Sequence, residues 1–404
     1  MNDDADDNRL VFSKFQNGYT DNTPATARTS NTVRLVNLGN KPLTISSAVL
    51  GGSDASAFSI ATPISSPITL SAGQTRDITV NFIATSGAVH NATLSFVTDS
   101  RNSAPSTVEL SGLWQSYPET NPQGVSQEPS LQQIIDAFGF RTYATYGSQV
   151  LDTNGVRTAT GDEVLSDYWE RADTLKPVYV KQLAAYRSAD YPAKFAWIRQ
   201  NTKTDNNSVF VASSTENQTV LPKVTGSTTK AAQGSFVPTT SVFGFRIDNE
   251  YGVDSFNTPA PNTSEVNPHR MRVFPVRDQN YNYVRDTYLV TVDYAGYNYD
   301  YNDGLYLVSN IKPSGKTTSV PGLAAFNEGG KIRLDFGDVS GATGYNVYRS
   351  DKANTGFSKI TSSVLTSSTY LDSTATSGKT WYYRVVAVNG SGEGNLVSTS
   401  VKLA

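Results

Sequence analysis

Short runs of alternating apolar and polar residues recur along most of this chain. In Thr75–Phe82, for example, Ile78, Val80 and Phe82 fall on one face of an extended strand. Clusters of Gly, Pro, Asn and Asp separate such runs and predict turns. Long stretches with a hydrophobic period of 3.6 residues are almost absent. The pattern therefore predicts an all-β protein.

The predicted strands gather in three regions. In the first we expect Arg9–Phe12, Thr32–Asn37, Leu43–Leu50, Thr75–Phe82, Ala92–Val97 and Thr107–Leu110, and in the second Val178–Tyr186, Val209–Ser213, Ser241–Ile247, Met271–Val276, Tyr288–Tyr294 and Leu305–Val308. One helix is expected at Leu131–Phe138, because its apolar residues share a face. Ser130 caps the start of this helix and Gly139 ends it.

Linker signals and the length of 404 residues favour three β-sandwich domains in series. The central one is expected to be a larger, jelly-roll-like sandwich. The expected units are an acidic tail (1–8), a first domain (9–113), a Pro/Gln/Ser-rich linker (114–130), a central domain (131–312), a short linker (313–317) and a third domain (318–404).

The first domain contains VRLVNLGNKPLTISSAVLGGSDASAFSI, ITLSAGQTRDITVNFIATS, HNATLSFVTDS and TVELSGL. These segments closely resemble the choice-of-anchor D modules, which are immunoglobulin-like domains related to the repeats of the abnormal spindle and hydin proteins. The resemblance covers nearly all of residues 9–113. It implies a structural and interaction scaffold in a secreted bacterial protein, and it carries no catalytic residues.

The third domain contains KIRLDFGDVSGATGYNVYRS, TYLD and WYYRVVAVNGSGEGNLVS. These segments resemble fibronectin type III domains over the whole of residues 318–404. The resemblance implies a spacer or interaction unit, so a function has to be argued from a specific site.

The composition of the chain limits the kinds of partner and the cellular location that we expect. The net charge is −3 and no Lys/Arg cluster is present, so no nucleic-acid partner is expected. No apolar run approaches the roughly 20 residues of a membrane-spanning helix. The absence of cysteine excludes disulfides and thiolate metal sites. The start, MNDDADD, is unlike a signal peptide, and we expect a secreted or cell-surface protein whose signal has been removed.

Oxygen-bearing side chains in Asp278–Pro313 raise the possibility of bound calcium, which takes six to eight oxygen ligands. Asp278, Asn280, Asn282 and Asp286 imitate half of a calcium loop, but the central glycine and terminal glutamate are missing, which favours a hairpin turn. The segment DYAGYNYDYNDGLYLVSN resembles an acidic loop of bacterial secreted domains. Asp293, Asp300, Asn302 and Asp303 form a second set of candidate calcium ligands, of which the resemblance implies Asp300, Asn302 and Asp303.

The tyrosines of the same segment suggest a second ligand class. Aromatic faces stack on sugar rings while neighbouring polar groups bind hydroxyls, so Tyr297, Tyr299 and Tyr301 are candidate glycan contacts. Tyrosine is also a preferred strand residue, and packing between strands is the alternative explanation.

No catalytic signature is present. The only histidines, His90 and His269, have no nucleophile motif around them. The carboxylates Asp162, Glu163, Asp167, Glu170 and Asp173 could hydrolyse a glycoside, but no pair among them is singled out by a motif. We expect a non-enzymatic structural or adhesive segment of a bacterial extracellular protein that contacts other surface proteins or itself. The alternatives are a carbohydrate-binding accessory protein and, third, a polysaccharide-acting enzyme.

Overall fold

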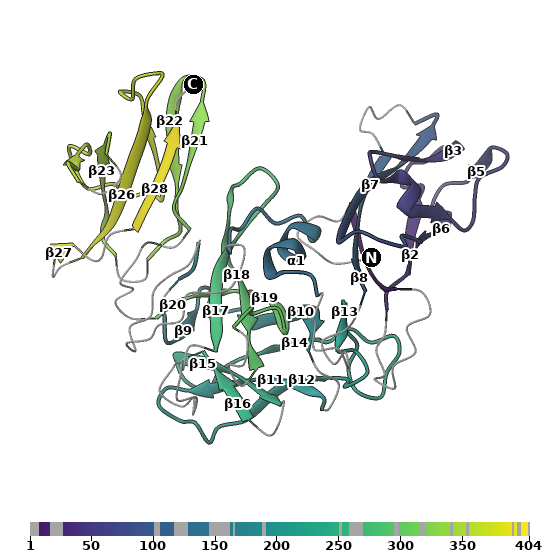
Figure 1. Cartoon of the computed structure of the whole chain (residues 1–404), viewed down its shortest axis with the longest axis horizontal. Helices are drawn as coiled ribbons and strands as arrows, with labels where there is room; N and C mark the ends of the chain where they lie inside the picture. Colours follow the sequence, from purple (N-terminus) through teal and green to yellow (C-terminus); the bar gives the residue numbers. More distant parts are fainter. Residues whose placement is uncertain are drawn as a thin grey trace.

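The computed structural model describes residues 8–16, 27–100, 106–116, 128–144, 162–164, 166–187, 191–249, 253–257, 270–294, 299–314, 320, 322–339, 342–352, 355–389, 392–393 and 397–402. Within these residues the chain is almost entirely β-structure, as predicted, and it is arranged as three sandwiches (Figure 1). No helix in the described part of the chain has the length and apolar character to cross a membrane.

The N-terminal module is a sandwich of two sheets. Its core includes the rings of Phe12, Phe58 and Phe82, with Phe58 centred 5.5 Å from Phe12 and 5.2 Å from Phe82. β1 runs parallel to β8, so the first strand of the module pairs with its last. One sheet has the order β1 (Arg9–Phe15), β8 (Ser106–Gln115), β7 (Val89–Thr98), β3 (Leu43–Gly51) and β5 (Ile68–Leu70), and the other the order β2 (Ser30–Val36), β6 (Thr75–Phe82) and β4 (Phe58–Ile60).

The central domain is a sandwich of two six-stranded sheets around an aromatic-rich core. Trp169, Phe195, Phe245, Tyr288 and Tyr306 meet between the sheets. The first sheet has the order β13 (Gln218–Val220), β10 (Val178–Tyr186), β19 (Gly304–Ser309), β18 (Tyr283–Val292) and β17 (Met271–Arg277), with β14 (Gln233–Phe236) on β10. The second has the order β12 (Asn207–Ala212), β11 (Ala193–Arg199), β15 (Val242–Asn249), β9 (Trp169–Arg171) and β20 (Ile311–Pro313), with β16 (Val253–Phe256) on β15.

Helix α1 (Leu131–Ala137) covers the outer face of the first sheet. The Ser130 hydroxyl oxygen accepts a hydrogen bond from the Gln133 N–H, and the Ser130 N–H donates to the Gln133 side-chain oxygen, so the predicted cap is present as a capping box. Gly139 follows the helix with φ +82°, as its predicted role in ending the helix requires. The apolar face of α1 packs on Leu183, Phe274, Leu289 and Leu305 of the sheet, among others.

The C-terminal module is a second small sandwich of two sheets. At its centre the Tyr383 hydroxyl donates to Asp372 at 2.9 Å, and Arg349 donates to the same carboxylate at 2.7 Å. One sheet has the order β21 (Ala324–Glu328), β22 (Lys331–Asp335) and β25 (Thr369–Asp372), and the other the order β24 (Ser358–Lys359), β23 (Gly344–Ser350), β26 (Thr380–Asn389) and β27 (Gly392–Glu393), with β28 (Val397–Lys402) on β26.

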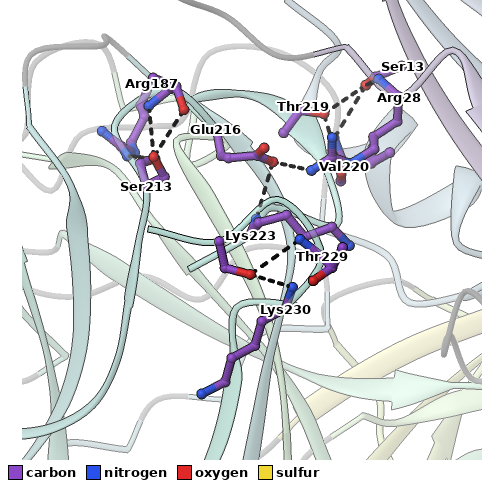
Figure 2. Close-up of polar contacts among 12 residues, drawn as sticks. Ser13, Arg28, Arg187, Ser213, Glu216, Thr219, Val220, Lys223, Thr229 and Lys230 are labelled. Carbon is purple, nitrogen blue, oxygen red and sulfur yellow. Dashed lines mark hydrogen bonds and ion pairs between the residues drawn. The ribbon is translucent and has the colours of Figure 1, made fainter. Parts of the chain in front are cut away.

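The N-terminal module and the central domain share a buried junction. Val11 and Leu113 enter the apolar cluster around α1. The Ser13 hydroxyl lies 3.0 Å from that of Thr219, and Arg28 forms an ion pair with Glu216, whose carboxylate also accepts from the Lys223 backbone at 3.2 Å (Figure 2). This junction joins the two units through both apolar packing and buried polar contacts.

The C-terminal module meets the central domain at the β17–β18 turn. Arg285 pairs with Asp338 at 2.9 Å, and the Tyr281 and Phe326 rings lie 5.9 Å apart. In Figure 1 the two outer modules rise on either side of the central domain, with α1 between them. Both side chains of the Arg285–Asp338 ion pair are exposed.

Candidate functional site

The carboxylates of the Asp293–Asp303 loop are engaged by the backbone. Asp293 accepts from the Asp300 N–H at 3.1 Å, and Asp303 accepts from the Tyr294 N–H. The Asn302 amide donates to the Pro129 carbonyl at 3.0 Å, tying the loop to the start of α1. Over the described residues, no three His, Cys, Asp or Glu side chains are grouped to hold a metal ion. The calcium site at Asp293, Asp300, Asn302 and Asp303 stays a prediction.

The tyrosines of this loop pack inward. Tyr299 and Tyr301 are buried in the cluster around α1, and the Arg272 guanidinium lies 4.7 Å from the centre of the Tyr301 ring. Both residues have positive φ, +57° and +59°, which turns the loop back over the sheet. Their rings pack inside the protein, which agrees with the alternative explanation that these tyrosines are packing residues. Tyr297 lies outside the described residues, and glycan contact at this loop stays a prediction.

The segment from Asp278 to Asp286 includes a tight turn between β17 and β18, as its missing calcium ligands had indicated. The Asp278 carboxylate accepts from the N–H groups of Asn280 at 2.8 Å and Asn282 at 2.9 Å. The turn places Tyr281 at its tip with φ +64°. Asp278 thus organises the turn that presents this tyrosine.

The carboxylates from Asp162 to Asp173 serve separate contacts. Glu163 is buried in an ion pair with Arg272, whereas Asp173 is exposed and lies 3.4 Å from Lys176. Glu170 lies 4.0 Å from Lys312. His90 contacts the Ser86 carbonyl at 2.7 Å, and His269 lies outside the described residues. The expectation that the chain is not an enzyme stays a prediction.

A cleft at the C-terminal junction brings together polar and aromatic side chains from distant parts of the sequence. Its volume is about 480 Å³. The central domain contributes Arg141, Tyr143, Asp162, Arg277 and Tyr281, and the C-terminal module contributes Leu323, Ala324, Ala325, Phe326 and Asn327. Clefts between domains that mix aromatic and charged groups are common ligand sites.

The first wall of the cleft is the segment that follows α1. Thr142 and Ala144 are buried, and Arg141 and Tyr143 alternate with them on the exposed side. The Thr142 hydroxyl donates to the Pro275 carbonyl at 2.7 Å, and the Arg141 N–H donates to the Arg277 carbonyl at 3.0 Å. The segment therefore lies along β17, and these hydrogen bonds anchor the backbone that carries Arg141 and Tyr143.

Aromatic rings stand on both sides of the cleft. Tyr143 is 50% exposed and Tyr281 is 49% exposed, so each keeps part of its ring open to solvent. Phe326, on β21 of the C-terminal module, faces Tyr281 at 5.9 Å with an angle of 60° between the rings. The cleft therefore combines accessible ring surface with depth.

The base of the cleft holds an ion pair. Arg277 is almost fully buried, and its Nε lies 3.3 Å from the Asp162 carboxylate, which also accepts from the Tyr143 N–H at 3.0 Å. Burial raises the pKa of Asp162, and the nearby Arg277 charge opposes that rise without cancelling it. The ion pair fixes the orientation of Arg277 beneath the two tyrosines.

The sequence had singled out Asp162, and Tyr281 lies in the tyrosine-containing segment Asp278–Pro313, but Arg141 and Tyr143 were not predicted. No alternation of apolar and polar residues marked these two positions, because the buried Thr142 is polar and the exposed Tyr143 is aromatic. The contribution of β21 could not be read from the sequence, because it depends on how two domains meet.

Comparisons with known proteins give partial similarities. No protein-family model matches the chain. Amylopullulanase from Thermoanaerobacter thermohydrosulfuricus is 30% identical over 173 residues, which are 40% of this chain and 12% of that enzyme. The chain thus spans about an eighth of the length of this curated relative.

Two solved structures share shorter segments. An Fn3-like protein from Clostridium thermocellum is 30% identical, and the match covers 20% of this chain and 86% of that protein with a TM-score of 0.19. Pectate lyase Pel3 from Pectobacterium carotovorum is 27% identical, over 19% of this chain and 26% of the lyase, with a TM-score of 0.17.

Proposed function

We propose that this chain is a non-catalytic, carbohydrate-associated segment of an extracellular protein, and that it binds polysaccharide in the cleft at the C-terminal junction. The observation that carries this proposal is the pair of half-exposed rings, Tyr143 and Tyr281, above the Arg277–Asp162 ion pair. Ring faces provide apolar surface for the C–H face of a sugar, and the charged groups can bind its hydroxyls.

The partial relative supports the same proposal. Its name, amylopullulanase, describes an enzyme that acts on pullulan, which is a polysaccharide. The charge and the lack of cysteine in this chain are compatible with a secreted or cell-surface setting.

Glycan binding by matched tyrosine variants tests the proposal. A panel of soluble polysaccharides, including pullulan, is titrated by calorimetry against the full chain and against Tyr143→Ala and Tyr281→Ala. We expect each variant to lose about ten-fold in affinity for any glycan bound, equivalent to about 1.4 kcal/mol. Tyr179→Ala is the control, because Tyr179 is 50% exposed on β10 and does not line the cleft.

Two results would overturn the proposal. The first is a panel in which no polysaccharide binds the wild-type chain. The second is binding that both cleft variants retain at full strength, since the glycan would then lie elsewhere.

A structural or adhesive role is the second candidate, and the buried N-terminal junction favours it. Arg28–Glu216 and the packing of Val11 and Leu113 hold two modules as one unit, as a spacer requires. This role predicts that the chain associates with itself or with another surface protein, and that Tyr281→Ala leaves this association unchanged. Light scattering over a concentration series measures the self-association. Release of reducing sugar from the same panel would instead support an enzyme.

A further inference from the structure

We infer that the cleft selects an acidic polysaccharide, with a sugar carboxylate held between Arg141 and Arg277, and that the glycan chain continues past Arg141 into a second cleft. This inference rests on the proposed function and specifies its ligand.

Arg141 is an available cation. Its backbone is fixed by the hydrogen bond to the Arg277 carbonyl, and its guanidinium lies 5.9 Å from the centre of the Tyr281 ring. No carboxylate of the described residues forms an ion pair with it, and its side chain is exposed. An arginine fork of this kind matches the geometry of a carboxylate, which accepts two parallel hydrogen bonds.

Arg277 offers a second donor from the base of the cleft. Its Nε faces Asp162, and its Nη1 donates to the Tyr281 carbonyl at 3.2 Å. Its Nη2 is buried and has no hydrogen-bond acceptor within the part of the chain that the structure describes. A buried donor without an acceptor is unfavourable, and an anionic ligand oxygen would satisfy it.

The charge of the cleft also favours an acidic ligand. Two arginines and one carboxylate line it, which leaves one net positive charge, whereas the whole chain carries −3. Because Asp162 already faces Arg277, the net charge lies at Arg141, on the exposed rim beside the tyrosines. A carboxylate at this point would be attracted by Arg141 and could reach Nη2 of Arg277.

Arg141 also lines a second cleft, of about 450 Å³, between the N-terminal module and α1. Arg9, Asn91, Glu109 and Asp136 are among the residues around it. Arg9 and Arg141 balance Glu109 and Asp136 in formal charge, so the second cleft has no net charge and suits hydroxyl groups better than an acid. The shared arginine makes the two clefts neighbours, which suits an extended chain of sugar units.

A matched pair of probes tests the acid preference. The probes are a hexamer of galacturonic acid and the same hexamer as its methyl ester, which keeps the sugar and removes the charge. We expect the acid to bind the wild-type chain about ten-fold more tightly. Arg141→Ala should abolish this difference, and Arg141→Lys should restore part of it, because a lysine keeps the charge without the fork. The control Arg76→Ala removes an exposed arginine outside both clefts and should leave the difference unchanged.

The outcomes separate this inference from the proposed function. Equal binding of acid and ester, weakened by Tyr281→Ala, would overturn the acid preference and leave the glycan cleft intact. If none of the glycans binds, both fail. Equal affinity for the acid dimer and hexamer would overturn the continuation into the second cleft. The last probe is a hexasaccharide of sugars that lack a carboxylate but carry sulfate groups. Tighter binding of this probe than of the galacturonic acid hexamer would overturn the assignment to a carboxylate.

Discussion

The two junctions of this protein are built in opposite ways. At the N-terminal junction, Val11 and Leu113 enter a core of the central domain, and Glu216, which is 6% exposed, pairs with Arg28. At the C-terminal junction the main ion pair, Arg285–Asp338, has side chains that are 69% and 48% exposed. The first junction buries its contacts and becomes part of the fold, whereas the second leaves an open cleft between two walls.

The difference suggests a division of labour. Apolar burial and enclosed ion pairs fix the relative position of two modules, so open space at the first junction is confined to the cleft beside Arg9 and α1. An exposed junction contributes little stability and keeps aromatic rings accessible. We therefore expect changes at the first junction to affect folding and changes at the second to affect binding.

Removing Glu216 should have the largest effect on stability. Glu216→Ala leaves Arg28 and the Lys223 N–H without their acceptor in a buried setting. We expect a loss of about 3 kcal/mol, measured as the shift of the urea unfolding midpoint of the full chain. Asp338→Ala, the matched change at the other junction, should cost less than about 1 kcal/mol. Similar losses for the two variants would contradict the contrast between the junctions.

A substitution at Gly139, which follows α1, tests how the helix contacts Arg9 of the N-terminal module. A Cβ at this position would lie 2.7 Å from Nε of Arg9, and the residue has φ +82°. We expect Gly139→Ala to cost about 2 kcal/mol in thermal or chemical unfolding, from backbone strain and displacement of Arg9. Gly226→Ala isolates the strain, because Gly226 has φ +75° and a Cβ added there would meet nothing within 4 Å. A smaller loss for Gly139→Ala than for Gly226→Ala would show that Arg9 is not held there.

The cleft should respond to pH through Asp162. Because its folded pKa is raised, the folded protein binds this proton more tightly than the unfolded chain does. Stability from this group therefore falls as pH rises from about 4 through the raised pKa, and it is regained on acidification. Asp162→Asn should lose this contribution, so the melting temperature of the wild type minus that of the variant should be greater at pH 4 than at pH 7. The opposite trend would mean that the attraction of Arg277 outweighs burial.

Removing Arg285 should have the smallest effect. Its ion pair with Asp338 is exposed, so Arg285→Ala should change the free energy of unfolding by less than about 0.5 kcal/mol. Affinity for any glycan in the cleft should change little as well, because Arg285 does not line it. A large loss of stability would show that the C-terminal module is held more firmly than its visible contacts indicate.

The sequence predicted the fold where one residue pattern controls one element. Helix α1 lies between Ser130 and Gly139, as predicted, and the predicted strand Val178–Tyr186 is β10. It missed β11, where AKFAWIR is buried on both faces and does not alternate. β8 runs to Gln115 and β20 to Pro313, so strands extend into both segments that were expected to be linkers.

The candidate site was harder to predict, for a physical reason. The Asp293–Asp303 loop attracted attention through its composition, but its carboxylates bind backbone N–H groups and its described tyrosines are buried. The cleft instead joins Arg141, Arg277 and Phe326, which are distant in sequence and meet only because two domains pack. Local patterns report secondary structure, whereas this site depends on tertiary arrangement.

The parallel pairing of β1 with β8 has a mechanical consequence. The two strands are in register from Arg9 opposite Glu109 to Phe15 opposite Gln115. A pull on the chain before Arg9 against an anchor beyond Gln115 therefore acts along the strands in opposite directions and loads the whole ladder in shear. Hydrogen bonds loaded in this way yield together, whereas those of a ladder pulled from one end open one after another. The module thus has the strand geometry of a domain that resists tension between its ends.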